Sequence, residues 1–201
     1  VELLLDGVSA FGAETIAWED WNVTAYAATA NKCLHGAPGI SFVIAKISVF
    51  HDRPSAANSI YLDLYTYYKA QLAASTPFTQ AVHICYALQQ ALKELEEAGG
   101  QQARQAEYRY RAARIRKGMK ALGIRTLLPE DAWSASLTSF LLPEGIRYRQ
   151  LHDQLKQDGF IIYAGQGSFK NEIFRIANMG AINSEAIDRL LQSFSNFFSI
   201  A

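Results

Sequence analysis

Two charged residues that follow apolar runs could together perform chemistry on a carbonyl compound. Asp6 ends the mostly apolar run Val1–Leu5, and Lys32 lies three residues beyond the run Val23–Thr29. A lysine amine forms a Schiff base with an aldehyde, and a carboxylate that faces a pyridine nitrogen keeps that ring protonated as an electron sink. Turn caps and solvated surface charges are common alternative explanations for such residues. The pair alone therefore gives a hypothesis, which the surrounding segments must support.

Three segments, in order along the chain, resemble class V, fold-type I aminotransferases, which use pyridoxal 5'-phosphate. They read DGVSAFG at residues 6–12, TANKCLHGAPG at residues 29–39 and FRIANMG at residues 174–180. The likeness is closest to the group that contains 2-aminoethylphosphonate–pyruvate transaminase and alanine–glyoxylate transaminase, and it runs over essentially the whole chain. It implies that this chain is the C-terminal portion of such an enzyme.

The resemblance implies a role for each residue of a small site. Lys32 would hold the cofactor aldehyde and, once released, would carry the proton that leaves the substrate. Asp6 would face the pyridine nitrogen. Arg175 would bind the substrate's carboxylate or phosphonate, since a guanidinium fork matches both groups. The other expected cofactor contacts are Val8 on one ring face, Thr29 and Asn31 near the phosphate or the ring oxygen, and Thr76.

Thr76 precedes Pro77 and follows an aromatic segment. In the family, a Thr-Pro at this place donates to the cofactor phosphate of the neighbouring subunit, so the resemblance implies a homodimer with a shared active site. A threonine before proline is also a common turn, and this second explanation stays open.

The pattern of apolar residues and the positions of glycine and proline predict the strands and helices that must position these residues. We expect strands at residues 1–5, 23–29 and 40–47, with helices at 59–72, 78–97 and 102–122. Functional groups that gather where strands end are typical of the ligand crevice of an open α/β sheet. Beyond Gly123 we expect strands at 124–128, 137–142, 160–163 and 173–177, and helices at 148–158 and 184–198, the last capped by Ser184.

The glycine pair Gly99-Gly100 divides the two patterns. The expected fold class is therefore α/β, with the C-terminal part of a fold-type I large domain in residues 1–99. A small α+β C-terminal domain would follow in residues 100–201.

Composition excludes several other functions. The 201 residues carry 19 basic and 19 acidic side chains, which argues against nucleic-acid or anionic-membrane partners. No apolar stretch reaches membrane-spanning length, and we expect a cytoplasmic protein. Cys33 and Cys85 form no C-x-x-C pair and the four histidines lack zinc-ligand spacing, so no metal is expected.

The activity that the resemblance implies is transamination between a small amine and a 2-oxo acid. The leading donor is 2-aminoethylphosphonate with pyruvate as acceptor, and alanine–glyoxylate or serine–pyruvate exchange stays open because Thr29 replaces the family's usual serine. A lyase or desulfurase would keep the cofactor, although Cys85 lies inside an expected helix, a poor place for a mobile nucleophile. An inactive fragment that lacks the N-terminal half of the site is the third alternative.

Overall fold

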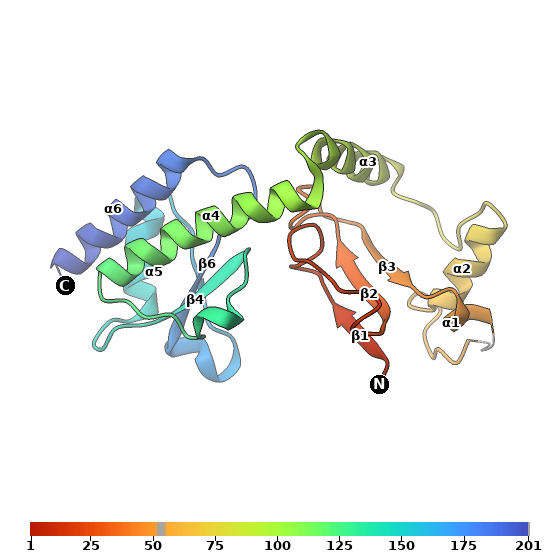
Figure 1. The fold of residues 1–201 in the computed structure, drawn as a ribbon, viewed down its shortest axis with the longest axis horizontal. Helices are drawn as coiled ribbons and strands as arrows, with labels where there is room; N and C mark the ends of the chain where they lie inside the picture. Colours follow the sequence, from red (N-terminus) through yellow and green to blue (C-terminus); the bar gives the residue numbers. More distant parts are fainter. Residues whose placement is uncertain (52–54, 201) are drawn as a thin grey trace. The chain divides into compact units, whose positions relative to one another are not determined.

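The computed structural model describes residues 1–51 and 55–200, and these divide into two compact units (Figure 1). Unit 1 comprises Val1–Phe11 and Thr15–Lys93, and unit 2 comprises Gly12–Glu14 and the chain from Glu94 onward. The short stretch Gly12–Glu14 therefore clusters with unit 2, although the residues on both sides of it belong to unit 1. Within the described part of the chain, no helix is long and apolar enough to cross a membrane.

Unit 1 is built on a three-stranded sheet in the order β1-β2-β3. β1 spans Leu3–Asp6, β2 spans Val23–Thr29 and β3 spans Ser41–Ala45. β2 pairs in parallel with β1 and antiparallel with β3. The central strand, β2, is the most buried of the three. Four of its seven residues are buried, namely Val23, Thr24, Tyr26 and Ala28. The parallel pair brings the carboxyl ends of β1 and β2 to the same edge of the sheet.

Three helices complete unit 1 and its junction with unit 2. α1 spans Ser48–His51, α2 spans Leu64–Leu72 and α3 spans Val82–Glu97. α2 begins later than the aromatic pattern predicted because Asp63 caps it, accepting the backbone N–H of Tyr65 at 3.1 Å. The hydroxyl of Thr66 donates to the same carboxylate at 2.6 Å and is the main reason that the pKa of Asp63 lies below its usual value.

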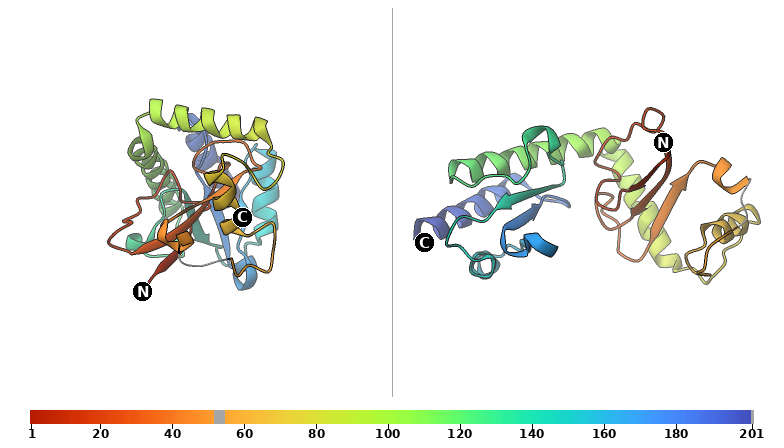
Figure 2. Two further views of the ribbon diagram at one scale, coloured as in Figure 1. Left: turned by 90° about the vertical axis from the view of Figure 1, so that its right-hand side faces the viewer. Right: turned by 90° about the horizontal axis from the view of Figure 1, so that it is seen from below.

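Unit 2 is an antiparallel sheet in the order β4-β6-β5 with a layer of helices (Figure 2). The strands are β4 (Leu137–Leu141), β5 (Tyr163–Ala164) and β6 (Ile173–Ala177). The helices are α4 (Gly100–Ala121), α5 (Tyr148–Gln157) and α6 (Ser184–Ile200), with short 3-10 helices at Glu130–Ala132 and Gly167–Asn171.

One face of this second sheet forms the hydrophobic core of unit 2. Phe140 of β4 stacks on Phe174 of β6 with ring centroids 5.4 Å apart, and Phe174 meets Phe194 of α6 at 5.6 Å. All three rings are fully buried and join apolar residues of α4 and α5 in one cluster. Side chains alternate along a strand, so Arg175, between Phe174 and Ile176, projects to the opposite face.

The structure corrects two sequence predictions in unit 2. Residues 124–128 do not form a strand, because only a single bridge joins Thr126 to Phe140. Ser184 is the first residue of α6 rather than its cap. The cap is Asn183, whose side-chain oxygen accepts the backbone N–H of Ala186 at 2.8 Å.

The connection from β5 to β6 begins at Gly165-Gln166-Gly167. A 3-10 helix fills it between β5 and β6, and β5 has only two residues. A β-carbon on Gly165 would lie 2.2 Å from the carbonyl oxygen of Phe169, so the close return of the chain requires glycine.

Candidate functional site

The carboxylate and the amine singled out in the sequence belong to neighbouring parallel strands. Asp6 is the last residue of β1 and pairs in register with Ala27 of β2. β2 ends two residues later at Thr29, and Lys32 follows in the loop. Because both strands run in the same direction, Asp6 and the Lys32 loop leave the sheet at one edge, where open α/β sheets bind their ligands.

Local contacts hold the Asp6 carboxylate at the strand end. Its Oδ1 atom accepts the backbone N–H of Val8 at 3.0 Å, and the N–H of Gly7 continues the strand pairing by donating to the carbonyl of Ala27 at 2.8 Å. A β-carbon on Gly7 would lie 1.9 Å from the ring of Tyr26, so only glycine lets the chain pass over this buried ring. Asp6 and Val8 are exposed at the surface of unit 1.

The loop that carries Lys32 closes on itself through backbone hydrogen bonds. The N–H of Gly36 donates to the carbonyl of Ala30 at 2.8 Å, and the N–H of His35 donates to the carbonyl of Lys32 at 3.0 Å. His35 has a positive φ of 62°, which makes the tight reversal possible. The Cys33 thiol is fully buried and donates to the carbonyl of Ser9 at 3.3 Å, so it joins the Lys32 loop to the loop that follows Asp6.

Thr29 and Asn31 flank this loop and bond to each other. The Thr29 hydroxyl lies 2.9 Å from the Asn31 side-chain oxygen and 3.0 Å from the carbonyl of Ile40. Lys32 itself is half-buried. Across residues 1–51 and 55–200, no hydrogen bond or ion pair engages its amine, which leaves the amine available to a ligand.

Thr76, the expected phosphate contact, lies in the exposed turn after α2. Its hydroxyl donates to the carbonyl of Phe78 at 2.8 Å, so the local turn that was the alternative explanation is present. Its reach to a neighbouring subunit stays a prediction.

Arg175 lies in the central strand of unit 2, opposite Ser139 on β4 and Tyr163 on β5. Its Nε atom donates to the carbonyl of Ala164 at 2.9 Å, and no contact with another described residue engages its two terminal nitrogens. These nitrogens are the pair that binds both oxygens of an acid. Burial raises the pKa of the nearby Tyr148, whose hydroxyl donates to the Ile162 carbonyl, and the positive charge of Arg175 opposes that shift.

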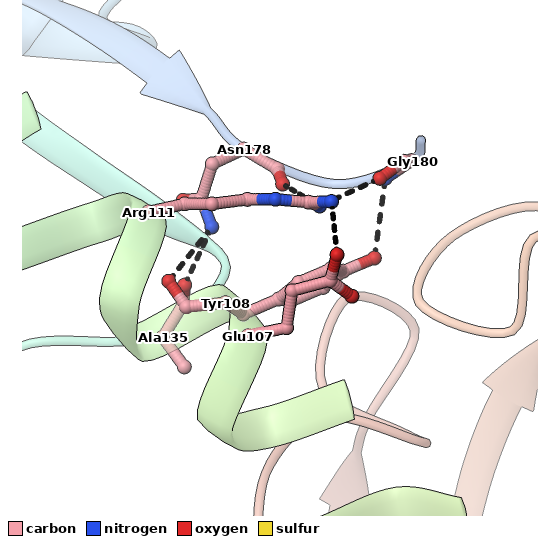
Figure 3. A network of polar contacts seen from close by, with 6 residues as sticks. All are labelled: Glu107, Tyr108, Arg111, Ala135, Asn178 and Gly180. Atoms are coloured by element: carbon pink, nitrogen blue, oxygen red, sulfur yellow. Dashed lines mark hydrogen bonds and ion pairs between the residues drawn. The ribbon is translucent and has the colours of Figure 1, made fainter. Parts of the chain in front are cut away.

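Sequence reasoning missed a polar network at the end of β6. Asn178 is buried there and contacts Tyr108 and Arg111 of α4 as well as Ala135 (Figure 3). The segment FRIANMG was noted for its arginine. The polar residue Asn178 directly after an apolar strand was the feature that could have predicted this network. In the described residues, no group of three or more histidine, cysteine, aspartate or glutamate side chains could hold a metal.

Comparison with known proteins yields one family and a consistent set of relatives. The family described as aminotransferase class-V matches residues 1–184. A 2-aminoethylphosphonate–pyruvate transaminase of Bacillus cytotoxicus is 37% identical over 195 residues, and one of Vibrio cholerae is 36% identical over 198. Each alignment covers 96% of this chain but only 53% and 54% of the relative. The chain thus spans about half the length of the curated relatives it matches.

Solved structures agree on the fold. An aspartate aminotransferase of subgroup IV from Thermus thermophilus superposes with a TM-score of 0.86 at 26% identity, covering 98% of this chain and 55% of that one. An alanine–glyoxylate aminotransferase from Nostoc sp. gives a TM-score of 0.86 at 20% identity, with 98% and 53% covered. The predicted fold class is therefore confirmed.

Gly7→Ala tests the packing that holds Asp6 in place. The added methyl group has to displace the Tyr26 ring, and such overpacking typically costs about 1–3 kcal/mol of unfolding free energy. Urea denaturation of the chain would measure the loss. In a Tyr26→Leu background the same substitution should cost less, because the clashing ring atoms are gone. An equal cost in both backgrounds would contradict this account of the turn.

Proposed function

This chain belongs to the class-V aminotransferase family, and from that premise we propose that it supplies the lysine, the ring-nitrogen carboxylate and the acid-binding arginine of a transaminase. The observation that carries the proposal is the placement of Asp6 and the Lys32 loop at one edge of the β1-β2 sheet. An amine that no described residue engages and a carboxylate oriented by the Val8 N–H are the two groups that this chemistry requires at such an edge.

The family implies pyridoxal 5'-phosphate as the cofactor, and the residues present fit it. When bound, this group supplies the electron sink that stabilises negative charge on the substrate's α-carbon. Asp6 is suited to accept the protonated ring nitrogen, because Val8 engages only its Oδ1 atom. Lys32 would bind the aldehyde carbon and, when displaced by substrate, would take the proton from the α-carbon and return it.

The remaining cofactor contacts are proposed for residues around the same edge. Val8 is exposed next to Asp6, where an apolar side chain can pack on a ring face. Thr29 and Asn31 lie directly before Lys32 and offer a hydroxyl and an amide. Thr76 would donate to the phosphate bound by a second copy of the chain, which makes the proposed enzyme a homodimer.

Arg175 would bind the acid group of the acceptor. Because Nε is engaged by the Ala164 carbonyl, the acid would meet the two terminal nitrogens end-on. We propose pyruvate or another 2-oxo acid as acceptor and 2-aminoethylphosphonate as the leading donor, since relatives with that name are 34–37% identical to the chain. Alanine–glyoxylate or serine–pyruvate exchange is the second candidate, because Thr29 stands where the group usually has serine.

Lys32→Ala tests the assignment of the cofactor lysine. In the complete gene product the variant should lose the visible absorbance of bound cofactor, and transamination should fall by about 10²–10⁴, the range typical of a missing acid–base group. Lys69→Ala, an exposed lysine on α2, is the matched control and should retain both signals. Undiminished absorbance in Lys32→Ala would refute the assignment. The 201-residue chain alone should show little turnover, and robust activity would contradict that expectation.

Arg175→Lys tests the acid-binding arginine. A single ammonium group cannot reproduce two parallel hydrogen bonds, so the KM for the 2-oxo acid should rise by about ten-fold or more. Steady-state kinetics with pyruvate would measure it, with Arg149→Lys on the exposed face of α5 as control. An unchanged KM would remove Arg175 from the site.

A panel of amino donors against pyruvate tests the substrate proposal. The complete gene product should turn over 2-aminoethylphosphonate with a kcat/KM at least about ten-fold above that for alanine or serine, which corresponds to about 1.4 kcal/mol of discrimination. A preference for alanine or serine would favour the second candidate function instead.

A further inference from the structure

We infer that Glu14 and Asn178 are positioning residues for Arg175, and that they act on the end of β6 through the backbone of Ala135. The inference rests on the proposed function, because it explains how the acid-binding arginine is held in place. Three sets of contacts within unit 2 carry it.

The first set surrounds Asn178, which follows the last residue of β6. The residue is 1% exposed, and its side-chain amide nitrogen donates to the carbonyl of Tyr108 at 3.2 Å and to the carbonyl of Ala135 at 2.9 Å. Its backbone N–H donates to the carbonyl of Ser136 at 3.0 Å. One buried amide therefore joins the end of β6 to α4 and to the segment that enters β4.

The second set connects the next residues to α4, as Figure 3 shows. The Nη1 atom of Arg111 lies 3.4 Å from the carbonyl oxygen of Asn178 and 2.7 Å from that of Gly180, while Nη2 pairs with Glu107. The Gly180 N–H donates to the hydroxyl oxygen of Tyr108 at 3.2 Å. Arg111 and Tyr108 are both buried. The chain is therefore fixed to α4 over the three residues that follow β6.

The third set brings in Glu14 from the short stretch that clusters with unit 2. Its Oε1 atom accepts the hydroxyl of Ser134 at 2.9 Å and the backbone N–H of Ala135 at 2.7 Å. The N–H of Ala135 thus binds Glu14 while its carbonyl binds Asn178, and the residue is 3% exposed. Removing the carboxylate would leave this N–H unsatisfied in a buried place, where it has no ready replacement.

The position of Arg175 depends on this anchorage for a geometrical reason. Asn178 lies three residues beyond Arg175, directly after the last residue of β6, so a shift of the strand along its axis would move both residues. Among the residues that the structure describes, the arginine side chain has one anchor of its own, the Nε contact with the Ala164 carbonyl. A shift of β6 along its axis would carry the terminal nitrogens with it, and misplacement by about 1 Å can cost about 10²-fold in an oriented reaction.

The test separates positioning from simple stabilisation. Glu14→Ala and Asn178→Ala in the complete gene product should each raise the KM for pyruvate by about ten-fold without changing the visible absorbance of bound cofactor. Glu14→Gln keeps a side-chain oxygen that can accept both bonds and should stay near the wild-type KM. Ser193→Ala, which removes the hydrogen bond from α6 to Asp158, is the control for a loss of stability in unit 2.

Amide hydrogen exchange provides a readout that needs no cofactor or substrate. Residues 174–178 should exchange faster in Glu14→Ala and Asn178→Ala than in Ser193→Ala. An unchanged KM in both alanine variants, or a rise equal to that in Ser193→Ala, would overturn the positioning role. If Arg175→Lys leaves KM unchanged, the acid-binding assignment itself fails, and this result is distinguishable because it does not depend on Glu14 or Asn178.

Discussion

The parallel pairing of β1 with β2 is the constraint on which the arrangement of unit 1 depends. It brings two strand ends, separated in the sequence by the segment from Gly7 to Asn22, to one edge of a sheet. The close passage of Gly7 over the Tyr26 ring fixes the first strand end, and the contact from Cys33 to Ser9 ties the second loop to it. The Asp6 carboxylate and the loop that carries Lys32 therefore both leave the sheet at this edge.

In unit 2, the packing of the sheet determines where Arg175 lies. Its apolar residues are committed to one face of the β4-β6-β5 sheet, where Phe140, Phe174 and Phe194 stack under the helices. Arg175 therefore lies on the opposite face of β6 from Phe174 and Ile176. Packing alone places a strand loosely along its own axis, whereas hydrogen bonds from Asn178 and Arg111 are directional. The backbone pairing of β6 with β4 and β5 sets its register, and the polar network fixes the end of the strand to α4 and to the segment that enters β4.

Sequence reasoning succeeded where the information was local. Val23–Thr29 and Ile173–Ala177 were predicted with the bounds that the structure has, because both are strongly apolar strands in the middle of their sheets. It failed where a distant partner decided the outcome. Residues 124–128 look like a strand but make only a single bridge, to Phe140 of β4. The cap of α6 was missed for a local reason instead, because Asn183 and Ser184 are adjacent and both are favourable N-cap residues. Glu14 drew no attention, because its partners Ser134 and Ala135 lie 120 and 121 residues away.

The hydrogen bond from Arg175 Nε to the Ala164 carbonyl has a consequence for selectivity. Because Nε is engaged, the guanidinium offers its two terminal nitrogens, and an oxyanion that binds both must approach along the axis of the side chain. Trigonal carboxylates and tetrahedral phosphonates both offer two oxygens to a pair of terminal guanidinium nitrogens, so the proposed acid-binding role of Arg175 is compatible with either group. In the transaminase proposed above, Arg175 would therefore anchor a phosphorus acid and a carbon acid in turn, and the length of each molecule would determine which of its atoms reaches Lys32.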